Sequence, residues 1–145
     1  MKKIIVFILL ASALLNMVVY ANDLERIDAK SYVLMDGISG KILIEKNATE
    51  KLPPASITKI MTMLLVMEEI DAGNISYDDV VTVSETAAKQ EGSHVFLASG
   101  EKITVRDLLK AVAVASGNDA ARALAEYVSG TQAAFVVKMN EIAKN

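Results

Sequence analysis

The sequence predicts an α+β protein in which a short β-hairpin precedes a mainly helical region. Two apolar runs, at residues 32–35 and 41–45, flank residues 36–40, whose two glycines supply turn geometry. From residue 56 onward, apolar residues recur at intervals of three and four, which is the spacing of one helix face. Pro53 and Pro54 separate the two regions, because proline can neither donate to a strand ladder nor continue a helix.

The first predicted helix begins at Ser56 and ends at Gly73. Its expected buried face follows the i, i+3, i+4, i+7, i+8 pattern. That face contains Ile57, Ile60, Met61, Leu64 and Leu65. A short extended piece is expected at residues 80–83. Ser84 is then typical of the N-cap of a small helix that ends before Gly92.

Three more helical segments are predicted after this small helix. Thr104 and Asp107 resemble a capping box, which places a helix start between them and a helix end near Ser116. The apolar stripe of this helix is Val105, Leu108, Leu109 and Val112. A further helix is expected at residues 119–128, and a last amphipathic segment at residues 135–142.

The N-terminus is typical of a secretory signal peptide. Lys2 and Lys3 form a positive n-region, an apolar h-region follows, and residues 19–21 fit a small-residue cleavage site. We therefore expect a signal peptide at residues 1–21 and an exported domain at residues 22–145. An uncleaved membrane anchor is the alternative, since the apolar stretch reaches the lower edge of what spans a bilayer.

Composition excludes several classes of function. The formal net charge of −3 argues against nucleic-acid binding, which needs a basic face. The chain has no cysteine, so it has neither a disulfide framework nor a thiolate metal site. His94 is the only histidine and cannot build a histidine-rich metal site. We therefore expect no metal site.

Two serines are followed three residues later by a lysine, and only one pair lies in a helical context. Ser56 and Lys59 lie at the start of the first predicted helix, where positions i and i+3 share one face. A lysine can then act as the base that a serine hydroxyl needs to become a nucleophile. Ser99 and Lys102 lie in a turn that contains a glycine, which does not hold the two side chains in register. Taken alone, Ser56 and Lys59 are more typical of an N-cap serine with a solvent-facing lysine than of a catalytic pair.

The only Ser-x-Asn sequence of the chain, Ser116-Gly117-Asn118, falls at a predicted helix–helix junction. A short loop there can direct a hydroxyl and an amide into a cleft, where the hydroxyl relays a proton and the amide holds a substrate backbone. The structural alternative is a helix C-cap, with Gly117 in the left-handed conformation and Asn118 as the next N-cap.

The segments at residues 54–62 and 115–121 resemble the first two motifs of the low-molecular-mass penicillin-binding proteins, and most closely the serine-type D-alanyl-D-alanine carboxypeptidases. Residues 92–101 and 104–109 resemble the same group. The resemblance covers the signal peptide and the chain from about Ala29 onward. It implies the N-terminal portion of a penicillin-binding protein or serine β-lactamase-like fold, of α/β sandwich type.

The resemblance also implies a role for each motif residue. Ser56 would be the acyl-ester nucleophile, Lys59 the general base and Ser116 the proton relay. Asn118 would contact the substrate backbone and Lys59. The implied reaction removes the terminal D-alanine of a peptidoglycan stem peptide that ends in D-Ala-D-Ala, outside the cytoplasm. β-Lactams would be covalent inhibitors, no cofactor is implied, and membrane contact would occur only through an uncleaved N-terminal segment.

The third motif of that family, Lys-Thr-Gly on a strand, does not occur in these 145 residues. We therefore expect an N-terminal fragment of the catalytic domain that lacks the C-terminal sheet strands. Two alternatives stay open. One is a class A β-lactamase-like hydrolase, which shares the fold and the motif order. The other is a non-catalytic exported module that binds peptidoglycan.

Overall fold

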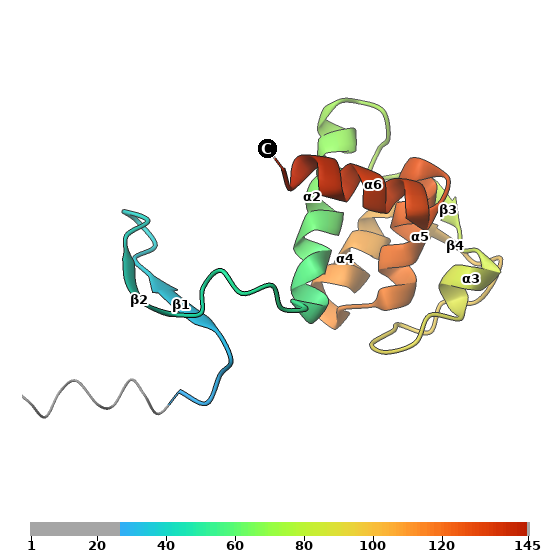
Figure 1. The fold of residues 1–145 in the computed structure, drawn as a ribbon. Helices are drawn as coiled ribbons and strands as arrows, with labels where there is room; N and C mark the ends of the chain where they lie inside the picture. Colours follow the sequence, from blue (N-terminus) through green and yellow to red (C-terminus); the bar gives the residue numbers. More distant parts are fainter. Residues whose placement is uncertain (1–26, 145) are drawn as a thin grey trace, which may run out of the picture. The chain divides into compact units, whose positions relative to one another are not determined.

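The computed structural model describes residues 27–144 and divides into two units, residues 1–52 and residues 53–145. Figure 1 shows the course of the chain and the labels used below. The predicted signal peptide at residues 1–21 lies outside the described residues. Within residues 27–144, no helix is both long enough and apolar enough to cross a membrane.

The first unit contains the predicted hairpin. Strand β1 (Tyr32–Met35) pairs antiparallel with β2 (Ile42–Lys46), and the register shifts between Leu34 and Met35. Asp36 closes the turn, because its Oδ1 accepts hydrogen bonds from the Ser39 backbone N–H at 2.7 Å and from the Ser39 hydroxyl at 2.6 Å. The prediction of a hairpin is confirmed, and its second strand lies one residue later than the sequence suggested.

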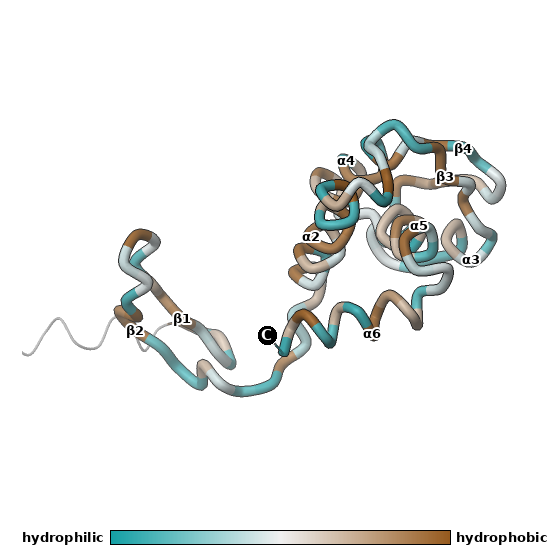
Figure 2. The backbone as a smooth tube through the Cα atoms, turned by 90° about the horizontal axis from the view of Figure 1, so that it is seen from above, coloured by the Kyte–Doolittle hydropathy of each residue, from teal (hydrophilic) through white to brown (hydrophobic). Residues whose placement is uncertain are grey.

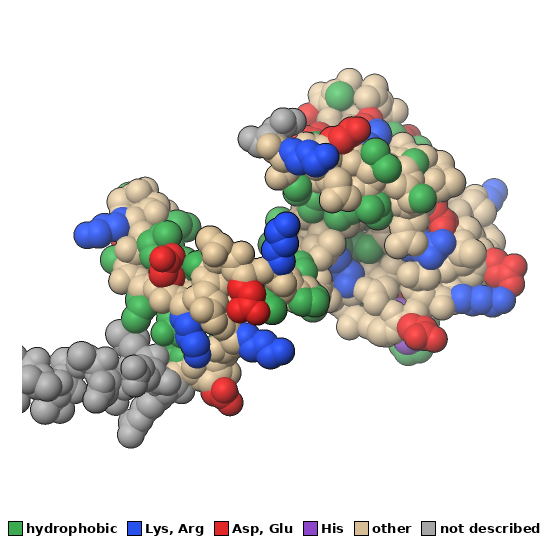
Figure 3. All heavy atoms as spheres, viewed as in Figure 1, with side chains coloured by type: hydrophobic (Ala, Val, Ile, Leu, Met, Phe, Trp, Pro, Cys, Tyr) green, Lys and Arg blue, Asp and Glu red, His purple; other side chains and the backbone are tan. Residues whose placement is uncertain are grey.

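The hairpin buries few of its own apolar side chains. Five of its large apolar residues are between 50% and 58% exposed, and hydrophobic side chains are visible on the hairpin surface in Figure 3. These residues are Val33, Leu34, Met35, Ile42 and Leu43. A two-stranded hairpin with so little buried surface is marginally stable by itself.

The second unit is mainly helical, and α5 lies at its centre. A 3₁₀ turn, η2 (Ala55–Ile57), leads directly into α2 (Thr58–Asp71). The short α3 (Glu85–Ala88) precedes the longer helices α4 (Val105–Ala115), α5 (Asn118–Ser129) and α6 (Gln132–Ile142). Helix α5 contacts α2, α3, α4 and α6, so it organises the unit (Figure 1).

The main hydrophobic core lies between α2, α3, α4, α5 and a second pair of short strands, at residues 80–82 and 102–104. Its largest fully buried apolar side chains are Val66, Val83, Val105, Leu108 and Leu124. A smaller cluster, formed by Leu65, Ala125 and Phe135, joins α6 to α2 and α5. The hydropathy-coloured tube in Figure 2 shows apolar stretches in each of the long helices. Burial of this kind supplies the main favourable term in folding.

A second small sheet joins β3 (Val80–Thr82) to β4 (Lys102–Thr104) in antiparallel register. The extended piece at residues 80–83 was predicted, whereas β4 was not, because only one of its three residues is apolar. Ser84 caps α3 as predicted, since its hydroxyl accepts from the Ala87 N–H at 2.9 Å.

The predicted buried face of the first helix is only partly right: Leu65 is buried and Met61 is half-buried, but the other three predicted residues are exposed. In α2 the buried residues are Thr62, Leu65 and Val66. Ile57 and Ile60 are 66% and 62% exposed, and Leu64 is also exposed. The reason is that most positions from 57 to 67 are apolar, so the periodic pattern does not select a face. Packing against α5 selects the face that carries Lys59 and Thr62 instead.

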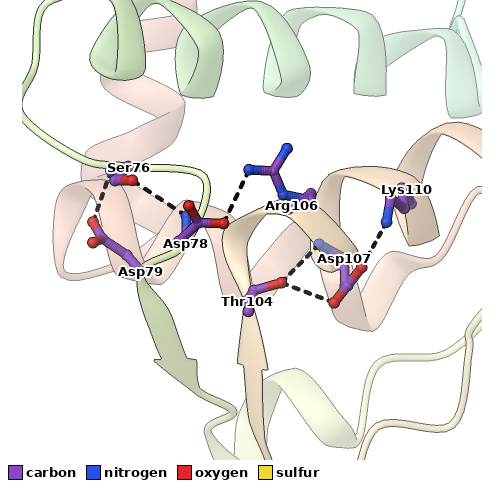
Figure 4. A network of polar contacts seen from close by, with 7 residues as sticks. All are labelled: Ser76, Asp78, Asp79, Thr104, Arg106, Asp107 and Lys110. Atoms are coloured by element: carbon purple, nitrogen blue, oxygen red, sulfur yellow. Dashed lines mark hydrogen bonds and ion pairs between the residues drawn. The ribbon is translucent and has the colours of Figure 1, made fainter.

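The predicted N-cap at Thr104 is confirmed, and Asp107 pairs with the Thr104 hydroxyl rather than with its backbone N–H (Figure 4). The Thr104 hydroxyl accepts from the Asp107 N–H at 3.1 Å and donates to Asp107 Oδ2 at 2.9 Å. The first two N–H groups of the helix, those of Val105 and Arg106, donate to the carbonyls of Asp79 and Tyr77, respectively. All of these N–H groups belong to the first turn, which has no acceptor within the helix.

Candidate active site

Lys59 lies between two serine hydroxyls that are far apart in the sequence. Its Nζ donates to Ser56 Oγ at 3.2 Å and to Ser116 Oγ at 3.2 Å. Ser56 is exposed, whereas Lys59 and Ser116 are half-buried. The fold therefore brings the two predicted motifs together and places the Lys59 amino group between the two hydroxyls.

A tight turn positions Ser56 at the start of α2. Ser56 lies in the 3₁₀ turn η2, so the α-helix begins at Thr58, two residues later than predicted. Ala55, the residue before it, has a φ of 50°, in the left-handed region that is unfavourable for a residue with a Cβ. Backbone strain of this kind persists only where the surrounding structure imposes it, and it clusters at functional sites.

Ser116 also has a left-handed backbone, with φ 55° and ψ 34°, and it forms the C-cap of α4. The structural alternative considered for this motif placed Gly117 in the left-handed conformation and Asn118 at the N-cap, and neither is found. Gly117 is extended, with φ −61° and ψ 119°, and precedes α5 as its N-cap. A Cβ on Gly117 would lie 2.9 Å from Asp119 Oδ1, so the glycine is needed for close approach rather than for a positive φ.

Asn118 is the first residue of α5 and is tied to the loop at residues 91–97. Its Nδ2 donates to the Glu91 carbonyl at 2.6 Å, and its backbone N–H donates to the Ser93 carbonyl at 2.6 Å. Among the hydrogen bonds of the described residues, none joins Asn118 directly to Lys59. Both residues line the same groove.

This groove has a volume of about 830 Å³ and runs between α2, α5 and α6. Ser56, Lys59 and Asn118 line one part of it, and Phe135 and Met139 of α6 line another. An apolar groove with a few convergent polar groups is the usual form of a ligand site. The arrangement can therefore hold an extended ligand with one of its bonds next to the Ser56 hydroxyl.

An ion pair within α5 lies beside the groove and was missed in the sequence, although its i, i+4 spacing is a recognisable signal. Arg122 Nε donates to Glu126 Oε1 at 2.8 Å, and Ser84 Oγ donates to Glu126 Oε2 at 2.6 Å. Burial alone would raise the pKa of Glu126. The hydrogen bonds from Ser84, Arg122 and Thr86 outweigh burial, so its pKa lies below the usual value.

The other polar residues considered in the sequence lie in different surroundings. Ser99 is in a turn and Lys102 begins β4, so this second serine–lysine pair has no helical register. His94 lies in an exposed loop, with its ring edge-to-face against Phe96 at a centroid distance of 4.3 Å. In the part of the chain that the structure describes, no group of acidic and histidine side chains is arranged to hold a metal ion.

The sequence profile of a family described as D-alanyl-D-alanine carboxypeptidase matches residues 17–145. The D-alanyl-D-alanine carboxypeptidase DacF of Bacillus subtilis is 54% identical over 117 residues, which is 81% of this chain and 30% of that protein. The chain thus spans about a third of the length of the curated relatives that it matches.

Solved structures of D-alanyl-D-alanine carboxypeptidases and penicillin-binding proteins are also similar to this chain. The D-alanyl-D-alanine carboxypeptidase DacD of Francisella tularensis is similar with a TM-score of 0.77 and 47% identity, over 81% of this chain and 29% of that one. Penicillin binding protein 5 of Haemophilus influenzae is similar with a TM-score of 0.76 and 41% identity, over 80% of this chain and 35% of that one.

Proposed function

This chain belongs to the D-alanyl-D-alanine carboxypeptidase family, and on that premise we propose that it carries the nucleophile half of a serine carboxypeptidase site. Its fold is that of the N-terminal part of the penicillin-binding proteins, with a hairpin followed by a mainly helical region. The proposed reaction removes the terminal D-alanine from a peptidoglycan stem peptide through an acyl-serine intermediate.

The observation that carries this proposal is the position of Lys59 at 3.2 Å from both hydroxyls. In the proposed mechanism, neutral Lys59 accepts the proton of Ser56 while Ser56 Oγ forms a bond to the peptide carbonyl carbon. The carbon–nitrogen bond then breaks, and Ser116 relays a proton to the amine of the departing D-alanine. Water attacks the resulting ester, and its proton returns through Lys59 as Ser56 is released.

The backbone around Ser56 favours the negative charge that forms on the carbonyl oxygen. Ser56 lies at the N-terminal end of η2 and α2, where helix N–H groups have no carbonyl partner and the helix dipole is positive. We propose the Ser56 N–H as one oxyanion donor. In the family the second donor comes from the Lys-Thr-Gly strand, and loss of one donor costs on the order of 10²–10³ in rate.

Asn118 is proposed to hold the substrate backbone, because it lines the groove beside Ser56 and its side chain is fixed by the Glu91 carbonyl. β-Lactams are proposed to acylate Ser56 in the same way as the peptide. We also propose that residues 1–21 are a signal peptide and that residues 22–145 act outside the cytoplasm. The substrate then lies in the same compartment as the enzyme.

A fluorescent penicillin tests this proposal on the 145-residue chain. We expect covalent labelling that disappears in Ser56→Ala, because no other serine has a lysine in helical register. Ser99→Ala is the matched control, since it removes the serine of the second serine–lysine pair and should leave labelling unchanged. A parent chain without label would contradict catalysis by these residues and favour a module that only binds peptidoglycan. Slow hydrolysis of a D-Ala-D-Ala peptide with fast turnover of the penicillin would favour the β-lactamase-like alternative.

A further inference from the structure

Asp119 is a buried acidic residue that the proposed reaction does not use. Its exposed fraction is 1%, and it follows Asn118 directly in the first turn of α5. The sequence suggested no role for it beyond membership of the helix. A buried carboxylate is costly unless its oxygens accept hydrogen bonds, so its partners indicate what it does.

The Asp119 carboxylate accepts hydrogen bonds from three backbone N–H groups. The Val95 N–H donates to both oxygens, at 3.2 and 3.1 Å, and the Leu97 N–H donates to Oδ2 at 3.1 Å. The third donor is the N–H of the next residue, Ala120, at 2.9 Å. Two of the three donors therefore come from a loop more than twenty residues earlier in the chain, as the sequence separations of 24 and 22 show.

The same loop also accepts hydrogen bonds from Asn118, whereas it donates hydrogen bonds to Asp119. The carbonyls of Glu91 and Ser93 accept from the side chain and the backbone of Asn118, each at 2.6 Å. The fit is close, because a Cβ on Gly92 would lie 2.7 Å from Asn118 Nδ2. The loop at residues 91–97 and the start of α5 thus exchange hydrogen bonds in both directions.

The loop contains one residue, Phe96, with a strained backbone. Phe96 has a φ of 63° and is 83% exposed, although a bulky residue rarely adopts a positive φ. Phe96 lies between the two residues whose N–H groups converge on Asp119. The hydrogen bonds to the carboxylate thus hold the backbone on both sides of this strained residue, and the Phe96 ring contacts the His94 ring edge-to-face.

We propose that Asp119 is a positioning residue that clamps residues 91–97 to the start of α5 and thereby fixes Asn118 and Ser116 opposite Lys59. The left-handed Ser116 is joined to Asp119 by only two residues, and Gly117 between them is packed against Val95 and Asp119. Asp119 touches neither of the proposed reacting hydroxyls. Its effect on the reaction rests on the function proposed above, whereas the clamp itself is a property of the fold.

Asp119→Asn tests the clamp, because the amide keeps the shape of the side chain but replaces one acceptor with a donor. In hydrogen exchange, we expect the Val95 and Leu97 amides to exchange about tenfold faster or more, since a buried donor loses its partner. Val112→Ala, which opens a cavity in the core of α4, is the control for general destabilisation. It should not change exchange at residues 95 and 97 selectively. Unchanged exchange of both amides in Asp119→Asn would overturn the clamp.

Penicillin acylation tests the positioning role. We expect Asp119→Asn to slow labelling about tenfold at a temperature where the variant is fully folded, and Val112→Ala to label within about twofold of the parent at that temperature. In an Asn118→Ala background the Asp119→Asn change should have little further effect, because residues that act as one unit are non-additive. Independent, multiplying losses would overturn the positioning role. If the parent chain takes no label, the proposed function fails, and the exchange experiment still decides on the clamp.

Discussion

At the scale of single residues, the site depends on two backbone positions that are unusual for their side chains and on one glycine that allows close approach. Ala55 and Ser116 have positive φ values and lie next to, or at, the two serines that Lys59 joins. Gly117 is extended, and its missing Cβ lets Asp119 approach the turn. Such strain typically costs on the order of 1–3 kcal/mol per residue, so the packing around the junction must offset it.

The role proposed for Lys59 as a general base predicts that a side chain that cannot lose its proton will not replace it. Lys59→Arg keeps the positive charge and much of the length of the side chain, but arginine cannot lose its proton in a protein. We expect the rate of penicillin acylation to fall by about 10²–10⁴, the range of general base catalysis. Labelling reactions quenched at a series of times and measured by in-gel fluorescence give this rate.

Lys110→Arg is the control for this experiment, because Lys110 is an exposed residue of α4 that pairs only with Asp107. It should acylate at the parent rate. Normal acylation of Lys59→Arg would show that another group takes the proton of Ser56.

At the scale of the elements, side-chain caps fix the starts of α3, α4 and α6, and a backbone carbonyl of the loop at residues 91–97 fixes the start of α5. Thr104 and Thr131 accept from the N–H groups of Asp107 and Ala134, and Ser84 does the same for α3. The C-terminal end of α4 and the start of α5 meet in the turn that contains Ser116. The placement of the proposed proton relay therefore depends on the length of α4.

The cap of α4 makes a prediction about stability. Thr104→Ala removes the hydroxyl that both accepts from and donates to Asp107, and we expect it to lower the free energy of unfolding by about 1 kcal/mol. Thr104→Ser keeps the hydroxyl and should change that free energy much less. Urea denaturation followed by circular dichroism measures both variants. Equal losses for the two variants would mean that the methyl group, rather than the cap, matters.

The contact between α3 and α5 predicts a dependence on pH. The pKa of Glu126 is lowered in the folded chain, so its ionised form stabilises the fold at neutral pH. This contribution is fully present above the unfolded pKa and is lost as the pH falls through the lower, folded pKa. We expect Glu126→Gln to be less stable than the parent at pH 7, and the gap to narrow on acidification below about pH 4.5.

Ser84→Ala is the matched variant for this measurement. It removes the hydrogen bond that Ser84 donates to Glu126 and should shift the acid loss of stability to higher pH. A gap between Glu126→Gln and the parent that stays constant across this pH range would contradict the assignment.

At the scale of the whole chain, the two units differ in how much surface each buries. Every fully buried residue of the described chain lies between Thr62 and Phe135, in the second unit. The strands of the hairpin are largely exposed. The stability of the described residues therefore comes mainly from the helical unit.

This distribution predicts that residues 53–145 keep their structure when residues 1–52 are removed. We expect the shortened chain to retain helical circular dichroism and a cooperative thermal transition, because its core is intact. Leu124→Ala in the shortened chain should lower the transition midpoint, since Leu124 is fully buried in that core. A gradual loss of signal without a transition would show that the helical unit needs the hairpin.

The sequence by itself determined the order of the α-helices and of three of the four strands, the caps at Ser84 and Thr104, and the residues of the two motifs. These depend on local chemistry: the turn glycines of the hairpin, the hydroxyls of Ser84 and Thr104, and the spacing between Ser56 and Lys59. Local chemistry also rejected Ser99 and Lys102, because a turn cannot hold them in helical register. The family followed from the same local motifs.

Only the tertiary structure decided which face of α2 is buried, that Ser116 rather than Gly117 is left-handed, and that Asp119 binds the loop at residues 91–97. Each depends on neighbours that are distant in the sequence. Packing against α5 selected the buried face of α2, and Asp119 lies so close to Gly117 that a Cβ there would not fit. The approach of Lys59 to Ser116 likewise arises from the packing of α2 on α5, which no pattern along the chain encodes.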